Sequence, residues 1–240
     1  MRAIWTIAKK EYELAMRSVT SYIVFVLFLV IAGLFFSTTV FKIALAEMRG
    51  VYGFMHLLFI FFVPAITMGS IAKERSSGTI ELLSTMPIRL SQIIWGKIVA
   101  AFLQLITLLA FCIVYFIIIY ILGEGVDIGA AIMGFIGLSL AGAAYVAIGV
   151  FASSLPSNQV LAFVIAFAIS AFFYVLRFVL IFLPLPLVKI FQYFSFEHHL
   201  SNFTKGVLDL KDLLFFLAVI AIFALLAEFN LQSKNMRQER

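Results

Sequence analysis

Two short stretches of the sequence carry side chains that could do chemistry, and each lacks part of the pattern that this chemistry needs. Glu197, His198 and His199 offer metal ligands, but adjacent histidines do not share a helical face and the H-E-x-x-H spacing is absent. Gly96 and Lys97 resemble the end of a phosphate-binding loop, but isoleucine follows them and the upstream glycine is missing. No G-x-S-x-G elbow occurs either. We therefore expect no catalytic centre, no metal site and no nucleotide hydrolysis by this chain itself.

The composition places the chain in a membrane. Hydrophobic residues make up 64% of the sequence and charged residues 12%, whereas soluble domains average about half and about a quarter. A helix needs about 20 apolar residues to cross a bilayer, and six runs are long enough: 21–41, 51–71, 98–122, 130–152, 160–183 and 213–231. We predict an all-α integral membrane protein with six transmembrane helices in a single domain over residues 1–240. The lone cysteine, Cys112, excludes an internal disulfide.

The distribution of lysine and arginine predicts the orientation. Six spans put both termini on one side, and basic residues favour the cytoplasmic side. The side of the termini holds Arg2, Lys9, Lys10, Arg17, Lys73, Arg75, Arg89, Lys97, Lys234, Arg237 and Arg240, and the opposite side holds Lys42, Arg49, Lys189, Lys205 and Lys211. Both termini are therefore predicted to be cytoplasmic. Because the basic residues lie beside apolar runs, we assign the formal charge of +5 to lipid contacts and topology and expect no nucleic-acid partner.

The segment before the first run has the periodicity of an amphipathic helix. At about 100° per residue, one face collects polar side chains and the other apolar ones, the latter being Ile4, Ala8, Tyr12, Ala15 and Val19. Such a helix lies in the membrane interface with its apolar face among acyl chains. Two roles fit the pattern equally: a juxtamembrane anchor, or a lever lying along the membrane.

Polar side chains interrupt the apolar runs at several positions. His56 is near the outer end of the second run, and we expect it at the interface. Arg177 is only about 9 Å of helix from the outer boundary, so snorkelling to the headgroups is favoured, and Glu228 near the inner end of the last run is interpreted in the same way. Gln104 is uncharged and is expected to form an interhelical hydrogen bond. Contact of Arg177, Gln104 or Glu228 with a substrate stays open.

The fourth run is rich in small residues. Gly137 and Ala141 are four residues apart, as are Ser139, Ala143 and Ala147. Small residues at this spacing let helix backbones approach closely, so we expect this helix to pack inside the bundle. The spacing does not tell whether its partners belong to the same chain or to a second copy.

Residues 184–211 are too apolar for a free loop and too broken by Pro184 and Pro186 for a span. Proline removes a backbone donor and restricts the residue before it, which interrupts a helix. We expect short extracytoplasmic helices that dip into the outer leaflet.

The longest polar interruption, "AKERSSGTIELLSTMPIRLSQ" at residues 72–92, has the pattern of a short helix with defined ends. Gly78 can serve as the N-cap, Glu81 falls in the first turn where the helix dipole favours an acid, and Pro87 ends the helix. The apolar face between these ends consists of Ile80, Leu82, Leu83 and Met86. This face suits a groove on another protein or the lipid surface, and the periodicity alone favours neither.

Four segments resemble one family. "KERSSGTIELLSTMPI" resembles the E-R-x-x-G-T-x-E-x-L-x-x-x-P signature of ABC-2 type transporter permeases. "AKKEYELAMRSVTSYIVFVLFLVIAGLFF", "GAAYVAIGVFASSLPSNQ" and "FTKGVLDLKDLLFFL" are similar to the same family, especially to its gliding-motility-associated type. The similarity covers nearly the whole chain, with the segments in the family's order.

The resemblance implies a role for particular residues. It implies a connecting helix at 3–18, which includes Lys9, Lys10, Glu11 and Arg17, and a cytoplasmic coupling helix at 74–87. The residues that would bind a partner ATPase through the coupling helix are Glu74, Arg75, Gly78, Thr79, Glu81, Leu82, Leu83 and Pro87. A second cytoplasmic contact would involve Ser153, Ser154 and Asn158, in "SSLPSNQ" where the family more usually has "SSLTxNQ".

The resemblance also implies partners and a location. The chain would be the permease subunit of an ATP-driven exporter in the bacterial inner membrane, paired with a second copy or a paralogue. A separate ATP-binding subunit would bind ATP and Mg, and this chain would need no cofactor. The alternative is a gliding-type membrane complex that transmits force or assembles envelope machinery without moving a solute.

Overall fold

The structure is a computed structural model that describes residues 2–42, 48–79, 89–122, 127–179 and 184–238 of the 240-residue chain. All regular elements in these ranges are helical. They are α1 (Arg2–Met16), α2 (Val19–Ser37), the π-helix η1 (Thr38–Lys42), α3 (Met48–Thr67), α4 (Ala72–Ser76), α6 (Leu90–Leu122), α7 (Ile128–Ser154), α8 (Gln159–Val179), α9 (Leu185–Gln192), α10 (Phe196–Thr204) and α11 (Leu210–Gln238).

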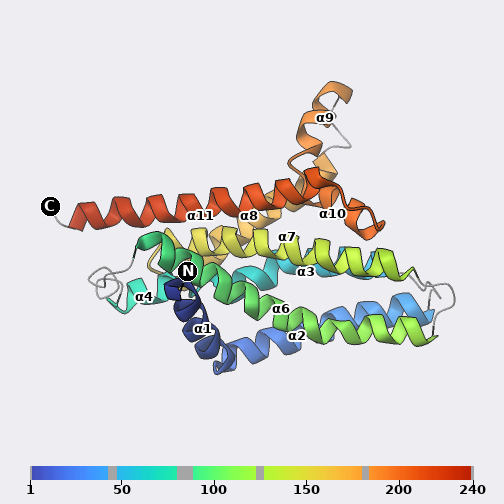
Figure 1. The fold of residues 1–240 in the computed structure, drawn as a ribbon, viewed down its shortest axis with the longest axis horizontal. Helices are drawn as coiled ribbons and strands as arrows, with labels where there is room; N and C mark the ends of the chain where they lie inside the picture. Colours follow the sequence, from blue (N-terminus) through green and yellow to red (C-terminus); the bar gives the residue numbers. More distant parts are fainter. Residues whose placement is uncertain (1, 43–47, 80–88, 123–126, 180–183, 239–240) are drawn as a thin grey trace.

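Six helical segments in the described part of the chain are long and apolar enough to span a membrane, which confirms the predicted fold class. The N-terminal helix α1 and the C-terminal part of α11 lie at one end of the bundle, where α4 also lies, as six spans require (Figure 1). We call this end the terminal end. The third span begins at Leu90, earlier than predicted, because α6 continues past its apolar run at the terminal end.

Helix α7 lies inside the bundle, as its small residues predicted: 72% of the residues in its most apolar 18-residue stretch are buried. A Cβ on Gly134 would meet the Tyr52 ring of α3 at 2.5 Å, and a Cβ on Gly137 would overlap Phe203 of α10. Gly142 lies against Leu105 of α6 in the same way. The partners of α7 in these contacts therefore come from the same chain, a point that the spacing had left open.

Gly149 makes the closest of these approaches, so its replacement tests the packing of α7. A Cβ at this position would overlap the side chain of Thr67, which ends α3 and donates a hydrogen bond to the Val63 carbonyl at 2.9 Å. We expect Gly149→Ala to lower the free energy of unfolding by about 1–3 kcal/mol, the usual cost of overpacking. The measurement is detergent unfolding followed by labelling of Cys112, which is buried in the folded chain. Gly53→Ala is the control, because a Cβ there meets nothing within 4 Å.

Helix α1 packs on α6 instead of laying its apolar face among acyl chains. Ala8 is fully buried, Ile7 lies 2.7 Å from the position of a Cβ on Gly96, and the Tyr12 hydroxyl is 2.8 Å from Thr107 Oγ1. The expectation of a lipid-facing surface fails for these residues because Gly96 lets the two helices approach closely. Trp5 stays exposed.

The segment after α8 forms two short helices, α9 and α10, as expected. Helix α10 packs against the bundle through three aromatic or aliphatic side chains that are almost completely buried: Phe196, Leu200 and Phe203. Helix α9 projects away from the bundle (Figure 1). Helix α10 is therefore part of the core at the far end, whereas α9 is peripheral.

Candidate functional site

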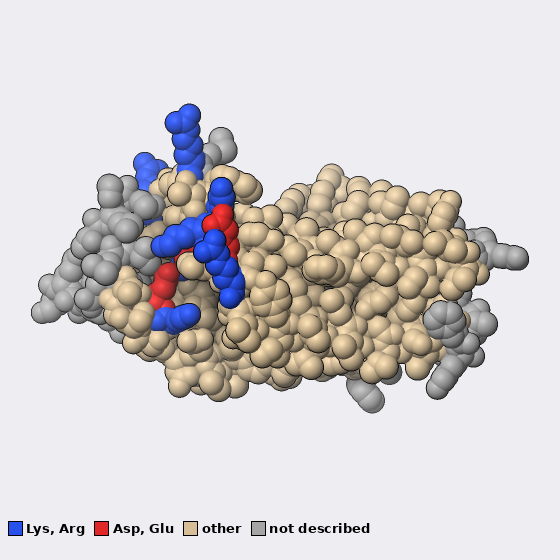
Figure 2. All heavy atoms as spheres, turned by 90° about the horizontal axis from the view of Figure 1, so that it is seen from below, with Lys and Arg blue, Asp and Glu red and all other residues tan. Residues whose placement is uncertain are grey.

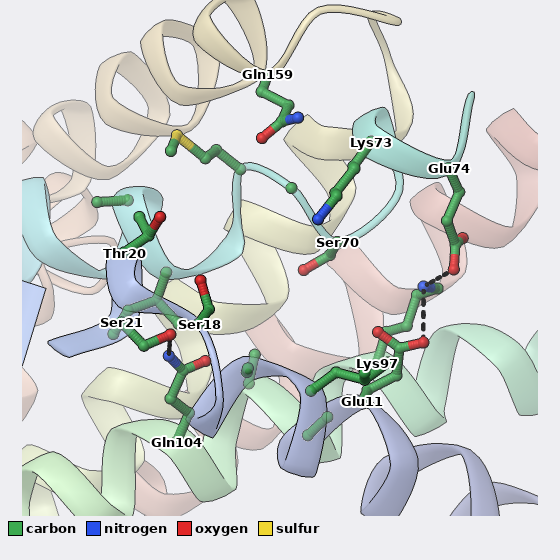
Figure 3. A pocket seen from close by; sticks show the side chains of 18 of the residues that line it. Glu11, Ser18, Thr20, Ser21, Ser70, Lys73, Glu74, Lys97, Gln104 and Gln159 are labelled. Atoms are coloured by element: carbon green, nitrogen blue, oxygen red, sulfur yellow. Dashed lines mark hydrogen bonds and ion pairs between the residues drawn. The ribbon is translucent and has the colours of Figure 1, made fainter. Parts of the chain in front are cut away.

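A pocket of about 410 Å³ lies at the terminal end, where α1, α2, α3, α4, α6 and the first residue of α8 meet. Lysine, arginine and acidic side chains gather at this end on the face drawn in Figure 2, and the rest of that face carries almost none. The pocket therefore lies where the charged part of the chain joins the apolar spans. Figure 3 shows side chains that line this pocket.

Lys97 ties three helices together on one side of this pocket. Its side chain is 3% exposed, and its Nζ lies 2.6 Å from Glu74 Oε1 and 3.8 Å from Glu11 Oε1 (Figure 3). A buried ammonium needs such partners, because its desolvation would otherwise cost several kcal/mol. The three residues come from α6, α4 and α1, so the ion pairs join the short helix α4 to a span and to the N-terminal helix.

Arg75 joins α4 to the end of α7. Its Nη1 donates to the carbonyl oxygens of Ser154 at 2.6 Å and Leu155 at 3.3 Å. Asn230 of α11 donates to the same Ser154 carbonyl at 2.7 Å. The end of α7 thus accepts hydrogen bonds from both α4 and α11, and the adjacent residues Glu74 and Arg75 bind different helices, α6 and α7.

Ser153 caps α4 from a distant part of the chain. Its hydroxyl oxygen accepts from the backbone N–H groups of Ile71 and Ala72, both at 3.0 Å, and it donates to the Met68 carbonyl at 2.9 Å. The first N–H groups of a helix lack intrahelical partners and are usually satisfied by a local side chain. Here Ile71 stands at the N-cap, so α7 supplies the missing acceptor.

Gly78 follows the end of α4; the helix that it was predicted to cap lies outside the described residues. Its φ is +71°, the left-handed conformation in which glycine commonly terminates a helix. The Thr79 N–H donates to the Glu74 carbonyl at 3.0 Å, which closes the turn. Gly78 therefore terminates α4.

The structure brings part of the predicted site together. Glu74 and Arg75 lie in α4, and Gly78 and Thr79 follow in an exposed turn. Four further residues of the predicted coupling helix, Glu81, Leu82, Leu83 and Pro87, lie outside the described residues.

We call the ion pairs and hydrogen bonds that join α4 to α1, α6 and α7, together with the bond from Asn230 of α11, the junction. Some of the other predicted residues lie in this junction, and the rest lie at the surface. Ser153 and Ser154 are fully buried within the junction, whereas Asn158 is exposed and caps α8 by accepting from the Val160 N–H at 2.8 Å. In or just after α1, Glu11 is half-buried at Lys97, and Lys9, Lys10 and Arg17 are exposed.

Sequence reasoning missed Lys97 and Asn230 as parts of this junction. Lys97 was considered as a fragment of a phosphate-binding loop and as a basic residue that sets the orientation, but not as a partner of Glu74. The available signal was its position inside the apolar stretch "IIWGKIVAA", where a charge is costly and needs a partner.

A second polar cluster lies away from the termini; it corrects the prediction for His56 and gives Arg177 a partner that was not predicted. His56 is fully buried; its Nδ1 is 3.0 Å from Glu197 Oε2 and its Nε2 is 3.0 Å from the Tyr145 hydroxyl. Arg177 Nη1 lies 3.2 Å from Glu197 Oε1. Glu197 of α10 therefore partners both side chains, which the sequence had assigned to the membrane interface and the headgroups.

The other polar side chains singled out in the sequence lie at separate places in the fold. Gln104 donates to Ser21 Oγ at 2.8 Å, which confirms the interhelical hydrogen bond. His199 Nδ1 lies 2.6 Å from Asp212 Oδ1, so it and Glu197 serve separate contacts. Across the described ranges no three His, Cys, Asp or Glu side chains gather as metal ligands. Glu228 is partly buried in α11.

Comparison with known families gives one match: residues 8–227 fit the model of a family described as ABC-2 family transporter protein. A search of curated proteins gives no match. The matched region includes α4, α6 and α7 completely and most of α1 and α11, and it ends before Asn230.

Proposed function

The chain belongs to the ABC-2 transporter family and is its non-catalytic membrane permease component; from this premise we propose that α4 receives the movement of a separate ATP-binding subunit. That subunit would bind ATP and Mg, and two permease chains, identical or paralogous, would form the complex. We further propose that the complex is an exporter of the bacterial cytoplasmic membrane, with the terminal end in the cytoplasm.

The observation that carries this proposal is the set of contacts made by α4. Glu74 reaches α6 and α1 through Lys97, Arg75 reaches the end of α7, and Ser153 of α7 caps the first turn. A rigid element with these contacts would transmit a displacement to several spans at once, which a lever between an ATPase and a transport path requires. A loop that merely joined two spans would need none of them.

The exposed turn after α4 is the proposed docking point, and cross-linking tests it. Thr79→Cys in a Cys112→Ala chain is expected to cross-link to a protein that carries the G-x-x-x-x-G-K-[ST] sequence of an ATPase. Thr38→Cys is the control, because Thr38 is also exposed but lies after α2 at the far end. Equal cross-linking from both positions, or from neither while the ATPase copurifies, would contradict the docking point.

The gliding-type resemblance supports a second candidate, in which the complex transmits force to envelope machinery without moving a solute. Reconstituted vesicles distinguish the two. ATP-dependent movement of a cargo across the bilayer supports export, whereas ATP hydrolysis that depends on an envelope partner and produces no flux supports the force-transmitting role.

A further inference from the structure

Part of the pocket at the terminal end is not used by the ion pairs of Lys97. Lys73, Ser70 and Gln159 approach this space from one side, and Ser18 and Thr20 approach it from the other (Figure 3). Their ammonium, hydroxyl and amide groups can all donate hydrogen bonds. Several donors around one space are suited to an acceptor with several oxygens.

The charges that line the pocket leave an excess of one positive charge. Lys10, Lys73 and Lys97 face Glu11 and Glu74. Lys97 is engaged by both glutamates, and Lys10 is close enough to Glu74 to act on it electrostatically. Within the described ranges neither Lys10 nor Lys73 makes an ion pair, so these two side chains share the excess charge, and Lys73 is the one that lies beside Ser70 and Gln159 (Figure 3). A phosphodiester carries one negative charge and would balance it.

The position of the pocket indicates where such a group would come from. The α1–α2 turn, the end of α3 and the start of α8 all line the pocket, and these are ends of membrane spans. Span ends lie at the level of the lipid headgroups. Leu14 and Ile66 add apolar surface beside the polar groups. A lipid site needs such surface, because the acyl chains begin next to the headgroup.

We propose that Lys73, with Ser70, Thr20 and Gln159, binds the phosphodiester headgroup of an anionic phospholipid from the leaflet at the terminal end. Basic pockets between transmembrane helices bind anionic headgroups by the same electrostatics. A headgroup at this site contacts α2, α4 and the start of α8, and thereby holds the proposed lever against two spans. Lipid binding at this site requires neither an ATPase nor a cargo, so its test is independent of the proposed function.

The test is lipid binding to the purified full chain in a zwitterionic detergent. Short-chain phosphatidylglycerol is titrated by native mass spectrometry, with short-chain phosphatidylcholine and inorganic phosphate as the other two arms. We expect phosphatidylglycerol to bind at one saturable site and Lys73→Gln to weaken that binding about tenfold, with Lys73→Arg retaining most of it. Lys9→Gln should leave it unchanged, because Lys9 lies outside the pocket and pairs with Glu13 at 3.9 Å.

Each other outcome contradicts the proposal. Equal binding of phosphatidylcholine would show that charge is not recognised. Inorganic phosphate that competes at equal concentration would identify a site for free anions instead of a lipid. Unchanged phosphatidylglycerol binding in Lys73→Gln would place the lipid elsewhere. Cys112 labelling checks that each variant is folded, and Lys73 is exposed, so its replacement leaves the packed core intact.

Discussion

Replacing Glu74 with glutamine is expected to lower the amount transported per ATP hydrolysed about tenfold while ATP hydrolysis continues. The glutamine would keep the size of the side chain and could still accept a hydrogen bond from Lys97, but the charge that balances the buried ammonium is lost. Lys97 would then have only the carboxylate of Glu11, at 3.8 Å. Removing one partner of a buried ion pair commonly costs about 3–5 kcal/mol, so the contact between α4 and α6 should loosen.

The measurement is cargo flux and phosphate release in the same reconstituted vesicles. Glu74→Ala should have a larger effect than Glu74→Gln, because it also removes the hydrogen bond of 2.6 Å to Lys97. Glu13→Gln is the matched control: Glu13 is exposed in α1, and its ion pair with Lys9 is 3.9 Å long. Full coupling in both Glu74 variants would show that the ion pair does not transmit movement.

A charge swap separates an internal role of Glu74 from direct contact with the ATPase. The double variant Glu74→Lys with Lys97→Glu restores an ion pair between α4 and α6 with reversed sign. If Glu74 acts through Lys97, the double variant should couple better than either single variant. If Glu74 instead touches the ATPase, the swap should be as uncoupled as Glu74→Lys alone.

Replacing Glu197 is expected to destabilise the far end of the bundle by about 2–3 kcal/mol, a typical cost of losing hydrogen bonds to a charged group. Glu197→Ala leaves the buried His56 Nδ1 without its carboxylate partner and frees Arg177, whose guanidinium also lies 4.5 Å from the Phe178 ring centre. Helix α10 would then be held mainly by its apolar side chains. Thermal unfolding followed by Cys112 labelling measures the loss.

The same carboxylate should make stability depend on pH. Burial tends to raise the pKa of Glu197, but the hydrogen bonds and charges of His56 and Arg177 outweigh burial and hold this pKa below its ordinary value. A depressed pKa means that the stabilisation is present above the unfolded carboxyl pKa of about 4.3. It is lost as the pH falls from there through the folded pKa.

Glu197→Gln should therefore show less loss of stability than the wild-type chain over this acidic range. The Tyr145 hydroxyl and the Tyr174 ring also face this cluster, and neither changes charge in acid, given an ordinary tyrosine pKa of about 10. Asp209→Asn is the control, because Asp209 is a partly exposed acid whose ion pair with Lys211 is 3.9 Å long. An identical acid profile in Glu197→Gln and the wild type would show that another group is responsible.

The membrane architecture was predictable because it depends on quantities that a sequence contains. Apolar runs of sufficient length must become helices in lipid, where backbone groups have no water to bind. The small residues of the fourth run predicted its burial correctly, because close approach depends on the absence of side chains. The hydrogen bond of Gln104 followed from the cost of leaving an amide unpaired.

The prediction for His56 failed, and the partner of Arg177 was not predicted, because that partner is distant in the sequence. His56 and Arg177 were assigned to the boundary because the carboxylate that satisfies them, Glu197, belongs to a segment that was expected to dip only shallowly into the leaflet.

The sequence by itself determined that this chain is a six-span helical membrane protein with a polar segment between its second and third spans, because length, apolarity and charge are properties of the residues alone. Only the tertiary structure decided which residues the side chains of that segment bind. Glu74 and Arg75 are neighbours in the sequence, yet one binds Lys97 and the other the Ser154 carbonyl. Which partner a charge finds depends on how the helices pack, because a buried charge is stabilised by the groups that lie near it in space.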